Sequence, residues 1–117
     1  ISAGSTHAID LLTVTPSQRE PGITNMSDIQ RHGVTRRWSD AVIHGGIAYF
    51  VEVADDPRQD VHGQVSQVLS QIDARLSLVG SDRTRLLQVL IYLADLADGP
   101  ALNALWDKWV PMGHAPA

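Results

Sequence analysis

The chain has 117 residues, of which 44% are hydrophobic and 19% charged, with 9 basic and 13 acidic side chains and a formal net charge of −4. This length fits one domain and excludes a multidomain enzyme, a TIM barrel and a full Rossmann fold. Cysteine is absent, which excludes disulfides, thiol catalysis and zinc–thiolate sites. The mild negative charge makes the chain a poor binder of nucleic acid or anionic membranes. No apolar run approaches the roughly 18 residues of a membrane span, so the default location is the cytoplasm.

The first 25 residues differ in composition from the rest, because they are rich in Ser, Thr, Gly and Pro. We interpret residues 1–25 as an extension, a leader or a segment of recombinant origin that stays outside the fold, and residues 26–117 as the domain. The alternative is that residues 11–15 form an edge strand, which Pro16 would end.

Two apolar runs, at residues 41–44 and 47–54, flank the pair Gly45-Gly46. This pattern predicts a β-hairpin, because glycine accepts the positive φ of a tight turn. Alternation along the second run places Glu52 on a largely apolar face. An unpaired carboxylate there costs several kcal/mol or takes up a proton. Glu52 is therefore either paired to an arginine at a sheet edge or interface, or a cleft carboxylate with a raised pKa.

The next segment predicts the clearest helix of the chain, from an N-cap at Asp60 to a C′ glycine at Gly80. Its apolar residues follow helical spacing and predict one buried face. The polar positions are expected on the remaining surface; they are Gln64, Gln67, Gln71, Asp73 and Arg75.

Residues 86–94 are almost continuously apolar and predict a central strand covered on both faces, paired in parallel with the strand before the helix. A second helix is expected after Asp98, with Pro100 in its first turn, an apolar stripe that includes Trp106 and Trp109, and an end at Pro111. The order strand, strand, helix, strand, helix predicts an α+β layer with two helices on one face of a sheet.

Few side chains are clear candidates for a catalytic or binding role. The five histidines, His7, His32, His44, His62 and His114, show no metal-ligand spacing on one helix. Asn103 is either solvent-facing or holds a substrate or a neighbouring loop by its amide. Trp38 is expected, like the other two tryptophans, in the core or at an interface, where large aromatic residues are frequent.

Four segments in order carry a family resemblance: RWSDAVIHGGIAYF, QVSQVLSQIDARLSLVGSDRTRLL, IYLADLAD and LNALWDKWVPMGHAPA. Together they resemble the reactive-intermediate deaminase (RidA) family, also called the YjgF or endoribonuclease L-PSP family. The resemblance implies a chorismate-mutase-like α+β fold, a homotrimer with small-molecule clefts between subunits, and no metal or organic cofactor. It also implies hydrolysis of reactive enamines and imines such as 2-aminoacrylate to keto acids and ammonia.

The same resemblance places four residues at the ligand cleft: Trp38, Phe50, Glu52 and Asn103. No catalytic residue is assigned. Ribonuclease and translation-inhibitor labels are attached to some members, and the acidic composition makes RNA the weaker substrate. A non-catalytic trimeric module that binds small metabolites or protein clients is the alternative to an enzyme.

The chain departs from the family pattern at two places. Glu52 stands at the usual glycine, where a side chain crowds the cleft and brings negative charge towards an anionic ligand. The carboxylate-binding arginine usually follows the Pro-Ala at residues 116–117, and we expect the family's last strands to be missing with it. Arg36 or Arg37 is a candidate substitute. We therefore expect weak or no deaminase activity, and a sheet completed by the N-terminal extension, by a neighbouring chain or by further residues.

Overall fold

The chain, described here by a computed structural model that covers residues 9–16 and 28–117, combines a five-stranded sheet with two α-helices. The strands are β1 (Ile9–Pro16), β2 (Gln30–His32), β3 (Ala41–His44), β4 (Ile47–Val53) and β5 (Gln88–Leu93). The α-helices are α1 (Val61–Leu78) and α2 (Gly99–Trp109), and two short 3-10 turns are η1 (Arg83–Arg85) and η2 (Leu96–Asp98). This is the predicted α+β class.

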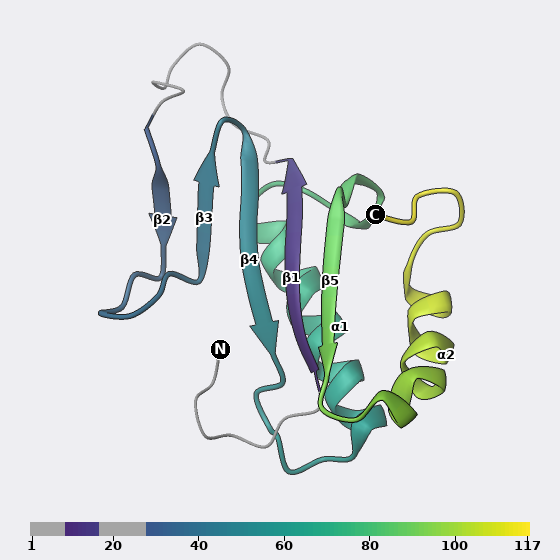
Figure 1. Cartoon of the computed structure of the whole chain (residues 1–117). Helices are drawn as coiled ribbons and strands as arrows, with labels where there is room; N and C mark the ends of the chain where they lie inside the picture. The colour runs from purple at the N-terminus through teal and green to yellow at the C-terminus, as the bar shows by residue number, and fades with distance from the viewer. Residues whose placement is uncertain (1–8, 17–27) are drawn as a thin grey trace.

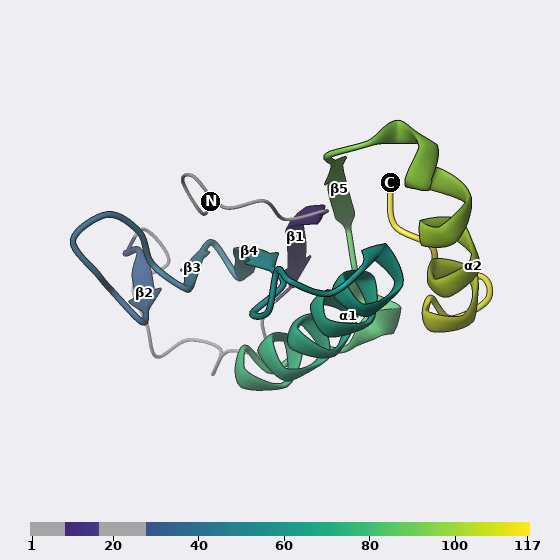
Figure 2. The same cartoon turned by 90° about the horizontal axis from the view of Figure 1, so that it is seen from below.

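The strands follow the order β2-β3-β4-β1-β5, and all neighbours are antiparallel (Figure 1). Helix α1 lies against one face of the sheet, and α2 packs beside α1 past β5 (Figure 2). Neither of the described α-helices lies on the opposite face of the sheet (Figure 2). The described residues thus form a two-layer structure with one face of the sheet covered by a helix.

The core lies between α1 and the helix-facing side of the sheet. Ile43 and Phe50 come from β3 and β4, and they face the apolar side of α1, where Val65, Ile72 and Leu76 are almost completely buried. Burial of each such side chain stabilises the fold by about 1.5–3 kcal/mol. The spacing of these residues along α1 is the helical pattern that the sequence shows.

The predicted hairpin is confirmed as β3 and β4, joined by Gly45-Gly46. Both glycines have positive φ, 60° and 79°. A two-residue turn with positive φ at both positions matches the right-handed twist of the strands, which is why the sequence needs glycine there.

Both predicted ends of α1 are also confirmed. The Asp60 side chain accepts a hydrogen bond from the Gly63 N–H at 2.9 Å. At the other end, Gly80 has a φ of 74° and follows the C-cap. The Ser81 N–H donates to the Leu76 carbonyl, and the Gly80 N–H donates to the Ser77 carbonyl. This pair of bonds is a Schellman motif, which satisfies carbonyls that the helix end leaves open.

Strand β1 corrects the interpretation of the N-terminal segment. Ile9–Pro16 pairs with β4 on one side and with β5 on the other. These eight residues therefore belong to the fold, in the sheet interior rather than at its edge, and Pro16 ends the strand as predicted. Strand β1 lies between β4 and β5 and provides hydrogen-bond partners for the backbone N–H and C=O groups of both strands. The origin of residues 1–25 stays a prediction.

Strand β5 differs from its prediction too. It is the end strand of the described sheet, and exposed and half-buried residues alternate along it. Because β1 is antiparallel to both β4 and β5, the latter two run in the same direction but do not pair. Only one face is covered by α1, so Leu90 and Tyr92 on the other face are exposed. A continuous apolar run does not distinguish this arrangement from a strand buried on both faces.

Helix α2 begins after Asp98, with Pro100 in its first turn, as predicted. Asp98 makes no side-chain cap bond; Asp95 instead caps η2 just before it. Trp109 is buried and joins α2 to α1, since its indole N–H donates to Asp73 at 3.2 Å. Arg83 pairs with the same carboxylate at 2.6 Å and lies 4.8 Å from the Trp109 ring centre. No described helix is long and apolar enough to cross a membrane.

Candidate functional site

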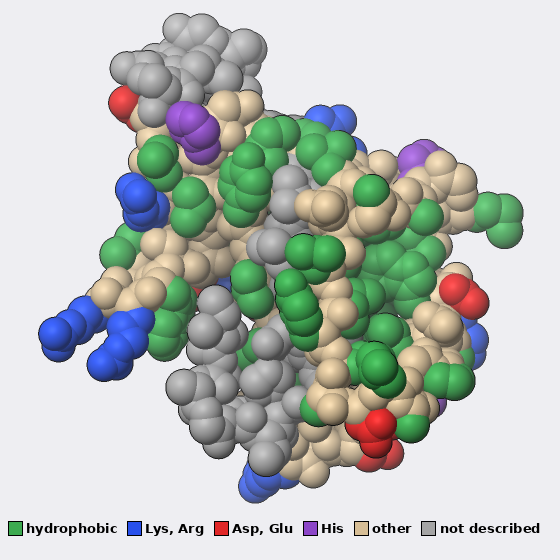
Figure 3. Space-filling view, viewed as in Figure 1, with side chains coloured by type: hydrophobic (Ala, Val, Ile, Leu, Met, Phe, Trp, Pro, Cys, Tyr) green, Lys and Arg blue, Asp and Glu red, His purple; other side chains and the backbone are tan. Residues whose placement is uncertain are grey.

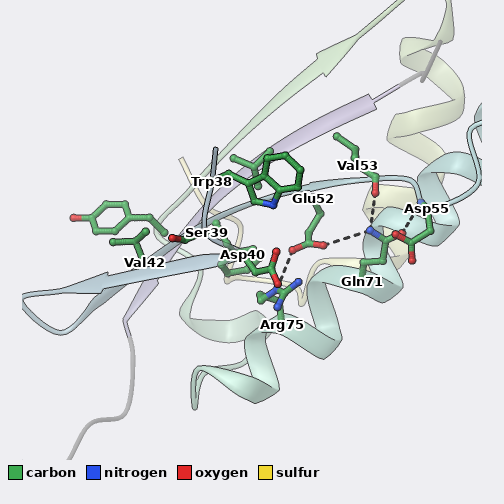
Figure 4. A pocket seen from close by; sticks show the side chains of 12 residues that line it. Trp38, Ser39, Asp40, Val42, Glu52, Val53, Asp55, Gln71 and Arg75 are labelled. Atoms are coloured by element: carbon green, nitrogen blue, oxygen red, sulfur yellow. Dashed lines mark hydrogen bonds and ion pairs between the residues drawn. The ribbon is translucent and has the colours of Figure 1, made fainter. Parts of the chain in front are cut away.

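A cavity of about 560 Å³ opens where β4 extends past β3. The pairing with β3 ends at Tyr49, so residues 50–53 have β1 on one side and no partner strand of the described sheet on the other. The chain at residues 38–40 and one side of α1 complete the walls (Figure 4). The polar and aromatic side chains that matter for its chemistry are Trp38, Asp40, Glu52, Asp55, Gln71 and Arg75.

Glu52 lies on the helix-facing side of β4, as the alternation predicts, and is only 7% exposed. Arg75 Nε donates to its Oε2 at 3.1 Å, and Gln71 Nε2 donates to its Oε1 at 3.4 Å. Burial raises the pKa of Glu52, and this effect outweighs the lowering by Arg75 and Gln71; the charge of Asp40 raises it further. Glu52 thus combines the two readings of the sequence: it is paired to an arginine and it lies in a cleft with a raised pKa.

Gln71 and Arg75 reach Glu52 because they are one helical turn apart on α1. They belong to a polar stripe on the side of the helix that faces β4 and the loop after it; its members are Gln64, Gln67, Gln71 and Arg75. The prediction that these positions lie on the surface was wrong for Gln64, which is buried, whereas Gln67, Gln71, Asp73 and Arg75 are half-buried. The amides of the three glutamines satisfy backbone groups of the loop, which an apolar side chain cannot do.

Trp38 stands at the cavity on a fixed backbone. The Thr35 hydroxyl accepts from the Trp38 N–H at 3.1 Å and donates to the Trp38 carbonyl at 3.0 Å. The Thr35 N–H also donates to that carbonyl at 2.8 Å. The side chain itself is 53% exposed and lies over Glu52 (Figure 4). Within this chain Trp38 is therefore not a core residue, in contrast to Trp109.

The structure brings together three of the four predicted site residues, Trp38, Phe50 and Glu52, in the lining of this cavity. Asn103 is exposed on α2 and does not line it. Its role as a ligand contact stays a prediction, and its solvent-facing position matches the simpler interpretation of the sequence.

Sequence reasoning missed the arginine of the site. Arg36 and Arg37, the candidate substitutes, are exposed and do not line the cavity, whereas Arg75 does. The available signal was the four-residue spacing between Gln71 and Arg75 on one flank of a helix. That signal does not specify the partner, because Glu52 lies 23 residues earlier in the chain.

The described parts of the chain, residues 9–16 and 28–117, hold no group of three or more side chains suited to bind a metal ion. The cavity contains the buried carboxyl group of Glu52, whose pKa is raised and which accepts hydrogen bonds from Arg75 and Gln71 beside the exposed ring of Trp38. A carboxyl group of this kind can transfer protons to or from a bound small molecule.

Comparisons with known proteins identify a family and several relatives of this chain. The family model described as Endoribonuclease L-PSP matches residues 29–117. A RutC family protein of Haemophilus ducreyi is 43% identical over 89 residues, which cover 75% of this chain and 76% of that protein. The RutC family protein YoaB of Escherichia coli K12 is 42% identical over 88 residues, covering 75% and 77%.

Solved structures agree with the sequence relatives. An uncharacterized protein from Pseudomonas aeruginosa superposes with a TM-score of 0.73 at 42% identity, covering 77% of this chain and 79% of that one. A member of the YjgF protein family from Neisseria meningitidis gives 0.72 at 37% identity, covering 80% and 78%. The fold predicted from the resemblance is thereby confirmed.

Proposed function

Because the chain belongs to the RidA/YjgF/RutC family, to which the endoribonuclease L-PSP model also applies, we propose that its cavity binds a small imine or enamine and hydrolyses it to a carbonyl compound and ammonia. The observation that carries the proposal is the Glu52 carboxyl group. It is buried at the cavity with a raised pKa, and therefore keeps a proton to higher pH than a free glutamate. Imine hydrolysis needs such a group, since protons must move as water adds and ammonia leaves.

The other residues of the cavity position this carboxyl group and the substrate. Arg75 and Gln71 hold one oxygen of Glu52 each. Trp38 and Phe50 supply apolar wall, so that a small organic molecule is held near Glu52 with little freedom. Water is the second reactant, and the reaction as proposed uses no metal or organic cofactor.

We expect slow hydrolysis of 2-aminoacrylate, because the cavity places Glu52 and Asp40 where the substrate's carboxylate would lie close to negative charge. The measurement is ammonia release from enzymatically generated 2-aminoacrylate, compared with the uncatalysed rate. A small acceleration is expected in the full chain and at least a tenfold loss of it in Glu52→Gln. Ser70→Ala, on the exposed side of α1, is the matched control and keeps the activity. No acceleration would exclude 2-aminoacrylate as a substrate, and equal acceleration by Glu52→Gln would contradict the role proposed for Glu52.

A second candidate is a non-catalytic module that binds small metabolites. It is favoured by the engagement of both Glu52 oxygens, which leaves the charged form of the carboxylate fully partnered. This candidate predicts a higher melting temperature with keto acids and no ammonia release. Ribonuclease activity ranks third, because a net charge of −4 opposes RNA binding.

We also propose that three copies of the chain assemble. Support comes from the face of the sheet opposite α1, where apolar side chains gather (Figure 3). Tyr49 is 41% exposed, Leu90 39% and Tyr92 62%. Exposed aromatic and aliphatic groups on one face are typical of a subunit interface.

A further inference from the structure

The charged groups of the cavity are unbalanced. Among the residues that the structure describes, three carboxylates line it, those of Asp40, Glu52 and Asp55, together with one guanidinium, that of Arg75. In its ionised form Glu52 offsets the positive charge of Arg75, whose Nε donates to it at 3.1 Å. Asp40 is close enough to Glu52 for its charge to raise the pKa of that residue. Even with Glu52 protonated, the remaining carboxylates outnumber the guanidinium.

A second observation, independent of the acidic groups, is the ring of Trp38. The turn with Thr35 fixes its backbone, while half of the side chain stays open at the cavity. A tryptophan face attracts cations within about 6 Å of its centre by ~0.5–2 kcal/mol. Because the backbone that carries this ring is already held, less conformational entropy is lost when a ligand orders the side chain.

From this combination we infer that the cavity selects a cationic ligand, namely the protonated imine of a simple amine that carries no carboxylate. The iminium group lies between the Trp38 ring and the Asp40 and Glu52 side chains, in a cavity large enough for a ring of six carbon atoms. A carboxylate on the ligand would face Asp40 and Glu52 instead. The inference rests on the proposed function for the reaction, but the preference for positive charge stands on the binding site alone.

The reaction balances without any further reagent. The oxygen of water bonds to the imine carbon as the π electrons of the C=N bond move to nitrogen. One proton of the added water passes to nitrogen through the Glu52 carboxyl group. The C–N bond then breaks with its electron pair on nitrogen, the second proton passes from the hydroxyl group to the departing ammonia, and a carbonyl compound and ammonium result. The positive charge stays on nitrogen at the start and at the end, so the same carboxylates stabilise both.

The binding experiment uses two stable probes of equal shape and opposite charge, cyclohexylammonium and cyclohexanecarboxylate. Isothermal titration calorimetry on the full chain at low salt is expected to give at least tenfold tighter binding of the ammonium. Added salt weakens that binding, because it screens charges. Equal binding, tighter binding of the carboxylate, or no binding of either probe overturns the inference.

Variants identify the residues responsible. Asp40→Asn and Trp38→Leu are each expected to weaken ammonium binding at least threefold, by loss of a charge and of a ring face. Asp107→Asn removes a carboxylate from the exposed side of α2, and it serves as the charge-matched control that keeps the affinity. Unchanged binding in both cavity variants contradicts the assigned site.

A parallel assay separates this inference from the proposed reaction. Ammonia release is measured with an imine generated from a primary amine by an amine oxidase, and with 2-aminoacrylate. Ammonium binding without turnover of either imine leaves the charge preference intact and contradicts the proposed hydrolysis. Faster turnover of 2-aminoacrylate keeps the hydrolysis and contradicts the charge preference.

Discussion

At the scale of single residues, the environment of Glu52 decides the chemistry of the cavity. Two donors favour its charged form, and burial at 7% exposure opposes it. Burial has the larger effect, so the pKa is raised although an arginine is bonded to the carboxylate. A buried ion pair that stabilised the charge more strongly than water would have lowered the pKa instead.

The raised pKa makes stability depend on pH in a defined direction. As pH rises above about 4.5, the ordinary value for this group, the unfolded chain releases the proton first. The folded state then holds more protons, so the free energy of unfolding falls with rising pH until the folded pKa is passed. Glu52→Gln removes this contribution. Urea unfolding at a series of pH values should show the wild type losing stability relative to Glu52→Gln.

Asp107→Asn controls for the other carboxylates, because it removes an exposed one. Its stability difference from the wild type should stay nearly constant over the same pH range. A wild type that gains stability relative to Glu52→Gln as pH rises would show that Arg75 outweighs burial.

At the scale of elements, the polar stripe of α1 determines the course of the chain after β4. Gln67 bonds to both backbone groups of Asp56, accepting from its N–H at 2.8 Å and donating to its carbonyl at 3.0 Å. Gln71 accepts from the Asp55 N–H and donates to the Val53 carbonyl. Four hydrogen bonds from two glutamines therefore position the loop that carries Asp55 at the cavity.

Gln67→Ala leaves the two backbone groups of Asp56 without these partners. We expect a loss of about 1–3 kcal/mol in the free energy of unfolding, because polar groups in a half-buried place lose hydrogen bonds. We also expect faster amide hydrogen exchange at Asp56, since that N–H donates to Gln67. Ser70→Ala, on the exposed side of the same helix, should change neither. A loss of stability without faster exchange at Asp56 would mean that the loop is held by other contacts.

The elements also show which parts of the fold local sequence patterns can predict. The Gly45-Gly46 hairpin, the Asp60 cap and the Gly80 end of α1 follow from conformational and hydrogen-bonding needs within a few residues, and each was predicted. The interior position of β1 in the sheet was not predicted. Its pairing with β4 and β5 joins segments that are distant in the sequence, and no local pattern connects them. The candidate site was predicted on another basis. The family resemblance, not a local pattern, places Trp38, Phe50 and Glu52 at the cleft, and these three residues line the cavity. Arg75 was missed, because its place in the site depends on a contact between distant segments.

At the scale of the whole molecule, the two faces of the sheet differ. One is covered by α1 (Figure 2), and Tyr49, Leu90 and Tyr92 are exposed on the other, which neither described α-helix covers. Burial of apolar area against another copy removes this surface from water at about 25 cal/mol per Å². This asymmetry supports the proposed trimer.

Size-exclusion chromatography with light scattering is expected to give a mass near three times the 12.7 kDa of one chain. Tyr92→Glu places a charge on the open face and should shift the mass towards a single chain, because an unpaired carboxylate is costly in an apolar interface. Ala104→Glu adds the same charge to the exposed side of α2 and should leave the mass unchanged. A single-chain mass for the wild type would contradict the proposal.

The interior position of β1 has a consequence for the order of folding. The hairpin of β3 and β4 closes through two residues, and α1 follows soon after in the chain, so these parts form through local contacts. Strand β5 finds no sheet neighbour among the described strands except β1. The first and last of the described strands, β1 and β5, must therefore meet across most of the chain before the sheet is complete. Because contacts between distant segments slow folding, we expect completion of the sheet to limit the folding rate and β5 to join the sheet last.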